Sequence, residues 1–110
     1  MAKALKSKKV TILGAGTYDI KPSSNDHCFI IHDIAVKHGA GAAQFVSLEI
    51  NDGTDQVTKQ TLSADGFMTL YHPLVSAYDV YYTIKNNSAS VTAEVLISYE
   101  LQNNNKNARL

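Results

Sequence analysis

The chain has 110 residues and a mass of 12.0 kDa, which is enough for one domain and no more. Its residues are 45% hydrophobic and 18% charged, and ten basic side chains balance ten acidic ones. This balance excludes a disordered chain, and no apolar run approaches the roughly 18 residues of a transmembrane helix. The single cysteine, Cys28, excludes an internal disulfide. We expect no signal peptide, because the basic N-terminus leads into no apolar stretch.

The zero net charge hides a difference between the ends of the chain and its middle. Residues 1–9 hold four lysines and no acid, and residues 104–110 hold one lysine and one arginine, again with no acid. All ten carboxylates lie in residues 10–103, where four lysines leave a formal charge of −6. Basic ends of this kind fit an acidic protein, nucleic acid or a neighbouring copy, and solvated ends are the alternative. The lysines that we expect to contact an acidic partner are Lys3, Lys6, Lys8 and Lys9.

The charge pattern also suggests how the chain is divided. We predict a basic N-terminal arm over residues 1–9, a folded domain over residues 10–101 and a polar tail over residues 102–110. Within the domain, the hydrophobic pattern has a period of two residues, as in strands that are buried on one face.

The first half of the domain predicts three strands. Two short strands are expected at 10–13 and 17–20, on either side of Gly14-Ala15-Gly16. These glycines lack the third glycine and the helix of a dinucleotide-binding loop, so a turn explains them. Residues 28–37 are apolar on both faces and predict an interior strand. We expect one face of it to hold Ile30, His32, Ile34 and Val36, and the other to hold Phe29, Ile31, Asp33 and Ala35.

A β-hairpin is predicted in the middle of the chain. Its first strand covers residues 46–50 and ends at Asn51-Asp52-Gly53, and its second strand covers residues 56–62. An Asp-Gly pair is typical of type I′ hairpin turns, in which both central residues have positive φ. We interpret Asp52 as an ordinary turn residue, because a calcium loop needs a fuller set of oxygen ligands.

Three more strands complete the predicted fold, at 67–70, 80–85 and 91–101. A polar connection, Asn86–Ala89, joins the last two. Eight short antiparallel strands in about 100 residues predict an all-β sandwich, and the eight-stranded jelly roll is its usual form. An immunoglobulin-like sandwich is the alternative, but the chain has no tryptophan and no second cysteine to bridge the sheets.

No arrangement of side chains predicts catalysis or metal binding. His27 and Cys28 are neighbours and so point to opposite faces of a strand, and His32 lies roughly 13 Å from Cys28, too far for one zinc ion. No serine stands in a Gly-x-Ser-x-Gly elbow, and a thiol inside a strand is usually inert. We therefore expect a protein that is not an enzyme, with no catalytic residues, cofactor or metal.

The six tyrosines favour contacts with other molecules, since tyrosine buries a large area and keeps a polar tip. Tyr78, Tyr81 and Tyr82 share one short segment. In a strand Tyr81 faces away from Tyr82, so at least one of them is expected to leave the core. We predict an oligomer interface at Tyr71, Tyr78 and Tyr81. Stacking on a sugar ring and ordinary tyrosines at the rim of a sheet are the alternatives.

Five segments of the chain carry a resemblance to a known type of protein: Val10–Tyr18, Ile30–Val36, Val46–Gly53, Leu62–Gly66 and Tyr81–Glu100. In strand order and turn texture they resemble small virion proteins of tailed bacteriophages, in which a short jelly roll forms trimers on the capsid or in the tail. The resemblance covers residues 9–101 and includes no diagnostic motif, so no functional residue is carried over from it.

The resemblance implies a structural role in the virion. Decoration (cement) proteins of this type bind and stabilise the major capsid shell as homotrimers, through their base and N-terminal arm. The alternative is a tail or head-fibre module that binds a host-surface glycan or receptor, through loops such as His38–Ala43 or Tyr71–Tyr78. We expect assembly into the virion in the host cytoplasm and no membrane partner. Nucleic acid is not expected, because the acidic body repels phosphate.

Overall fold

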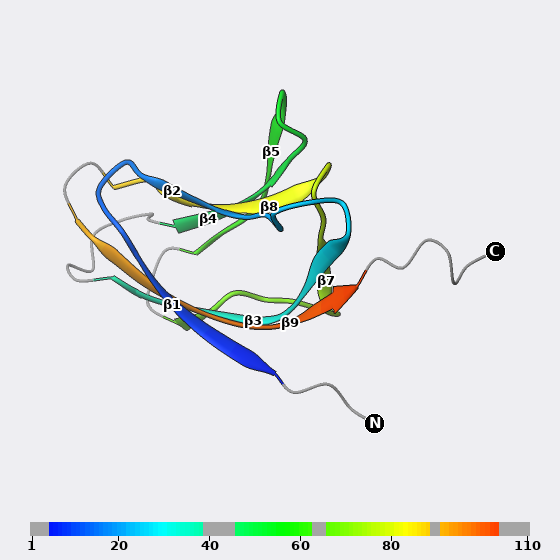
Figure 1. Ribbon diagram of the computed structural model, residues 1–110. Coiled ribbons are helices and arrows are strands. Elements are labelled where there is room, and N and C mark those ends of the chain that lie inside the picture. Colours follow the sequence, from blue (N-terminus) through cyan, green and yellow to red (C-terminus); the bar gives the residue numbers. More distant parts are fainter. Residues whose placement is uncertain (1–4, 39–45, 63–65, 89–90, 104–110) are drawn as a thin grey trace.

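The computed structural model describes residues 5–38, 46–62, 66–88 and 91–103. In this part of the chain two antiparallel sheets face each other, and Figure 1 shows them as an upper and a lower layer. The predicted all-β sandwich is confirmed. The described residues contain no helix, and so none that is long and apolar enough to cross a membrane. The strands are β1 (Lys6–Ile12), β2 (Thr17–Ile20), β3 (His27–His38), β4 (Val46–Asn51), β5 (Gln56–Leu62), β6 (Gly66–Phe67), β7 (Leu74–Ser76), β8 (Tyr81–Asn86) and β9 (Ala93–Asn103).

The strand order is that of a jelly roll. The first sheet, sheet A, has the order β1-β9-β3-β6, and β7 also pairs with β3. The second sheet, sheet B, has the order β2-β8-β4-β5. The described residues form nine strands instead of the predicted eight. The strand expected at 67–70 is reduced to β6 at Gly66–Phe67, and β7 at Leu74–Ser76 was not predicted; the two pair with different parts of β3. Pro73, which has no N–H to donate, directly precedes β7.

The core lies between the sheets and is formed mainly by inward residues of β1, β2, β3, β4, β8 and β9, with Met68 and Leu74. Leu48 and Ile84 of sheet B, and Ile31, Ile34 and Val95 of sheet A, have almost no exposed surface. Burying a side chain of this size contributes about 1.5–3 kcal/mol, so these contacts hold the two layers together.

Asn86 adds a polar link between the sheets. Its side chain is fully buried at the end of β8, and its Nδ2 donates to the carbonyl oxygens of Ile12, Leu13 and Val91 at 3.0, 3.2 and 2.7 Å. Its Oδ1 accepts the N–H of Ser88 at 3.1 Å. The polar connection that follows β8 therefore leads from sheet B across to sheet A, and one amide satisfies the backbone groups at the crossing.

The predicted faces of β3 are wrong in part, because the strand contains a β-bulge. Ile31 and Asp33 pair with consecutive residues of β9, which leaves His32 as the extra residue. An extra residue turns the side chains that follow it to the opposite face. As a result Ile31, Ile34 and Val36 all face the core, although the alternation of the sequence placed Ile31 on the other face.

Both ends of the folded domain extend further than predicted. β1 begins at Lys6, four residues before the predicted boundary, and it pairs with β9 from there to Ile12. β9 continues to Asn103, two residues into the predicted tail. The part of the basic arm that the structure describes is therefore a strand of the sandwich.

The predicted β4–β5 hairpin is confirmed, but its turn is not of type I′. The loop has four residues, Asp52–Asp55, and only Gly53 among them has a positive φ, of 92°. Asp52 Oδ1 accepts the N–H groups of Asp55 and Thr54 at 2.7 and 2.9 Å, and Asn51 Oδ1 accepts that of Gly53 at 2.7 Å. The bonds from Asp55 and then Thr54 lower the pKa of the Asp52 carboxyl, because they favour its charged form.

Candidate attachment site

β1 is an edge strand of sheet A, and it carries most of the lysines predicted to contact an acidic partner. Lys6, Lys8 and Lys9 are all exposed, and Lys3 lies outside the described residues. An edge strand presents unpaired backbone groups to other strands, and lysines along it discourage indiscriminate pairing. β1 is therefore suited to a partner strand that brings negative charge.

The alternation of the strand divides these lysines between two surfaces. Lys6 and Lys8 lie on the side that faces sheet B, whereas Lys9 lies on the outer side. Lys9 Nζ is 3.5 Å from Glu94 Oε2 in an exposed ion pair within the chain. The structure thus brings Lys6 and Lys8 together and places Lys9 elsewhere.

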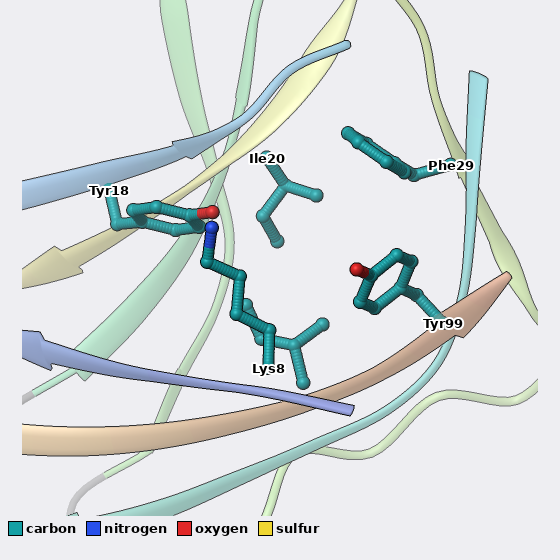
Figure 2. Close-up of a pocket in the computed structure, with 6 residues that line it drawn as sticks. Lys8, Tyr18, Ile20, Phe29 and Tyr99 are labelled. Carbon is teal, nitrogen blue, oxygen red and sulfur yellow. The ribbon is translucent and has the colours of Figure 1, made fainter. Parts of the chain in front are cut away.

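A small aromatic pocket opens beside Lys8, between the two sheets (Figure 2). Its volume is about 60 Å³, which gives room for one small apolar side chain. Strands β1, β2, β3 and β9 all contribute to its walls. The lining residues are Lys8, Tyr18, Ile20, Phe29, Ile97 and Tyr99.

The pocket has an apolar interior and a polar rim. The rings of Phe29 and Tyr99 meet edge to face, with centroids 5.3 Å apart, and the buried Ile20 lines the pocket beside them. Lys8 Nζ is 5.6 Å from the centre of the Tyr18 ring, and Figure 2 shows the hydroxyls of Tyr18 and Tyr99 directed into the opening. An ammonium and two phenols can all donate hydrogen bonds. The arrangement suits an apolar side chain that stands next to a carboxylate.

The sequence indicated Lys8 but not the pocket. Tyr18, Phe29 and Tyr99 belong to three strands that lie far apart in the chain, and no spacing connects them. The available signal was the alternation that turns Tyr18 and Tyr99 to the same side of their strands as Ile20 and Ile97. That signal becomes specific only when the pairing of β1, β9 and β3 is known.

The predicted tyrosine interface does not form one surface. Tyr71 is 93% exposed, but Tyr81 is only 7% exposed. Lys21 Nζ lies 4.6 Å from the ring centre of Tyr78 and 4.8 Å from that of Tyr81, so the chain itself covers Tyr81. Tyr82 is half-buried, and desolvation raises the pKa of its hydroxyl. Tyr82 packs against the core, whereas Tyr81 leaves it as expected and lies on the outer side of sheet B, where Lys21 and Tyr78 cover it. Tyr71 remains the exposed ring.

Tyr71 borders a separate groove of about 350 Å³. In it Gln60 Nε2 donates to the carbonyl of Thr69 at 2.7 Å, and Gln60 Oε1 accepts the N–H of Thr69 at 3.0 Å. An exposed ring beside amide and imidazole groups suits stacking on a sugar and bonding to its hydroxyls. Residues 39–43 of the other loop considered for glycan binding lie outside the described residues. The groove is lined by Lys59, Gln60, Thr69, Leu70, Tyr71, His72 and Leu74.

Two further reactive side chains, His32 and Cys28, are engaged with neighbours in sheet A. His32 Nε2 lies 2.9 Å from Glu100 Oε1, and both side chains are half-buried. The buried Cys28 places its Sγ 4.0 Å from Gln102 Oε1. Within the described ranges, no three histidine, cysteine, aspartate or glutamate side chains gather as they would around a metal ion.

Fold and site together define a small jelly-roll sandwich that has a basic edge strand beside an aromatic pocket. Comparison with protein-family models and with curated proteins gave no match to this chain. Because jelly rolls serve many functions, the role of the chain has to follow from the chemistry of its surface.

Proposed function

We propose that this chain is a non-enzymatic structural protein of a virion, which decorates and stabilises the major capsid shell or binds another virion protein. An acidic segment of the partner lies along β1, and an apolar side chain of the same segment enters the pocket beside Lys8. The observation that carries the proposal is the position of exposed lysines on an edge strand that borders this pocket. The capsid location, and a homotrimer that forms where the chain is bound to the shell, are proposed from the resemblance in strand order alone.

Three physical contributions support attachment at β1. Each backbone hydrogen bond to an added strand contributes a net of about 0.5–1.5 kcal/mol. Each exposed lysine–carboxylate contact contributes about 0.2–1 kcal/mol. An apolar side chain that fills the pocket adds a buried anchor of the kind that dominates protein interfaces.

The charge distribution supports one orientation of the bound protein. The formal charge of −6 over residues 10–103 repels an acidic surface, whereas the lysines of residues 1–9 are attracted to it. Such an asymmetry selects the approach with β1 foremost and speeds the encounter at low salt.

A double charge reversal tests the attachment. Lys6→Glu with Lys8→Glu changes the charge of the site and leaves the backbone pairing of β1 in place. The probe is empty shells of the major capsid protein encoded in the same genome, and binding is followed by co-sedimentation over a salt series. We expect the variant to bind about tenfold more weakly at low salt, with a flatter dependence on salt.

The matched control is Lys59→Glu with Lys85→Glu, which makes the same change in charge at exposed sites away from β1. We expect this control to bind the shells as the native chain does. Equal binding by the native chain and the Lys6→Glu, Lys8→Glu variant would rule out attachment through β1.

A second function is favoured by the groove at Tyr71. Its exposed ring and polar lining support a tail or head-fibre module that binds a glycan on the host surface. In that case Tyr71→Ala abolishes agglutination of host cells, and the Lys6→Glu, Lys8→Glu variant agglutinates normally. The opposite pattern, with capsid binding lost only in the lysine variant, contradicts the glycan role.

A further inference from the structure

The outer face of sheet A carries apolar side chains that no described part of the chain covers. Phe67 of β6 is 68% exposed, Leu96 of β9 is 45% exposed and Val75 of β7 is 56% exposed. Apolar groups that gather on one face of a sheet are typical of a surface that binds another protein. We call this surface outer face A, and its central residues are Lys9, Ala35, Lys37, Phe67, Glu94 and Leu96.

The strand register arranges these residues in two rows across the sheet. The first row, from β1 to β6, is Lys9, Leu96, Ala35 and Phe67. In the second row, two residues away along the strands, Glu94 of β9 pairs with Lys37 of β3. A hollow of about 260 Å³ lies beside Leu96, between β1 and β3. Outer face A therefore has a projecting aromatic ring at its β6 edge and a hollow over β9 and β3 that Lys9 of β1 borders.

This pattern is complementary to itself. The relevant twofold axis lies at the outer surface of sheet A, parallel to the strands and midway between β3 and β9. Rotation about it places β9 of one copy on β3 of the other, and β1 on β6. Leu96 then packs on the small side chain of Ala35. Phe67 lies against Lys9 at the border of the hollow, and the ammonium of Lys9 meets the aromatic ring. Each contact occurs twice, because the same surface is used by both copies.

We infer that outer face A binds a second copy of this chain and forms a twofold-symmetric dimer. Charge favours this partner, since the axis that pairs the apolar groups also places Glu94 of each copy against Lys37 of the other. Lys37 is exposed and has no ion pair among the described residues. Glu94, which is 3.5 Å from Lys9 in its own chain, then lies between two ammonium groups.

The size of the surface predicts a weak dimer. Four strands about 4.8 Å apart and six residues of about 3.4 Å each give roughly 400 Å² per copy, or roughly 800 Å² in total. This area belongs to the class of transient contacts, so we expect a dissociation constant on the order of 100 µM. The inference does not depend on the attachment proposed at β1 or on the identity of its partner.

Sedimentation of the full chain tests the dimer. Between about 10 µM and about 1 mM at low salt, the mass is expected to rise from 12.0 kDa toward twice that value. Phe67→Ser is expected to weaken the association at least tenfold. Tyr71→Ser, which removes an exposed aromatic ring from another surface, is the matched control and is expected to leave the association unchanged.

Charge reversal tests the geometry independently of the apolar contact. Lys37→Glu places two glutamates together in the dimer, and Glu94→Lys places two lysines together, so neither variant is expected to associate with itself. A mixture of the two variants restores both opposite-charge contacts, and we expect it to dimerise as the native chain does. Recovery on mixing distinguishes a contact between copies from a change in folding of either variant.

The following results each overturn the inference. They are a native chain that stays monomeric at about 1 mM, an association that Phe67→Ser and Tyr71→Ser affect equally, and a mixture of the charge variants that fails to recover. A mass of three copies that Phe67→Ser does not change also overturns it, because the chain then associates through another surface.

Discussion

The outer faces of the two sheets differ in what covers their side chains. On outer face A the apolar side chains of Phe67 and Leu96 are exposed. On the outer face of sheet B, which we call outer face B, the polar side chains of Ser47, Glu49 and Thr83 are buried, and Glu49 is only 7% exposed. In Figure 1 the end of the β4–β5 hairpin rises from sheet B, and so it adds a wall above this face.

The buried polar groups of outer face B bond to one another. Glu49 Oε2 accepts hydrogen bonds from Ser47 Oγ at 2.6 Å and from Thr58 Oγ1 at 3.0 Å. Thr83 Oγ1 donates to Asp19 Oδ1 at 2.9 Å. Buried polar groups that find such partners cost little, whereas unpaired ones cost about 1–3 kcal/mol each.

The polar side chains of outer face B are buried and bonded within the chain, whereas the apolar side chains of outer face A are exposed to water. The buried polar groups of outer face B find hydrogen-bond partners within the chain, so their burial needs no second molecule. Outer face A keeps apolar area in water, at a cost of roughly 25 cal/mol for each Å² that a partner would remove. We therefore expect protein partners of this chain to bind sheet A, at its outer face and along its edge strand β1.

The largest expected effect comes from changing which residues of β3 face outward. Deletion of Ala35 allows two registers of β3 against β9, and both are unfavourable. With the bulge retained, Val36 turns outward and Lys37 turns into the core; with the bulge removed, Asp33 turns inward and Ile34 turns outward. We expect this variant to lose cooperative thermal unfolding, as followed by circular dichroism.

Deletion of His32 is the matched control at the same strand. Removing the extra residue leaves Ile31, Ile34 and Val36 inward and Asp33 outward in a regular ladder, with the loss of one bond to Glu100. We expect this variant to unfold cooperatively. Loss of folding in both variants would show that the bulge is required for more than register.

The comparison also shows which parts of the fold the sequence can predict. Alternation with a period of two predicted the sandwich, because each strand buries one face whatever its neighbours are. The bulge at His32 was not predicted, since it exists only relative to the pairing with β9. The hairpin was predicted from Asp52-Gly53, but its turn type depends on the side chain of Asp52, which holds a four-residue loop.

The candidate site was predictable to a smaller degree. Charge counting located the lysines of β1, because charge is a property of the sequence alone. It did not show that Lys9 lies on the other side of the strand from Lys8, nor that Lys8 borders an aromatic pocket. Both facts depend on which strands are neighbours, and the same is true of Tyr81, which Lys21 and Tyr78 cover.

Single substitutions on the two outer faces are expected to have a smaller effect on the free energy of unfolding. Glu49→Ala removes the acceptor of the Ser47 and Thr58 hydroxyls on outer face B, and we expect a loss of about 1–3 kcal/mol in the free energy of unfolding. Leu96→Ser on outer face A is expected to change it by less than about 0.5 kcal/mol, measured by urea at concentrations that keep the chain monomeric. Equal losses would contradict the contrast between the two faces.

The smallest expected effect is the pH dependence of the hairpin beside outer face B. Hydrogen bonds from the N–H groups of Asp55 and Thr54 lower the pKa of Asp52 from its ordinary value of 3.8 in the folded state. A carboxyl with a lowered pKa stabilises the fold at pH values above 3.8, and this stabilisation disappears as the pH falls through the folded-state pKa. The free energy of unfolding should therefore fall less steeply below pH 3.8 in Asp52→Asn than in the native chain.

Asp55→Asn is the control, because it removes a carboxylate at the other end of the same loop. Its curve of unfolding free energy against pH is expected to stay closer to that of the native chain. Parallel curves for the native chain and Asp52→Asn would show that these bonds do not stabilise the hairpin.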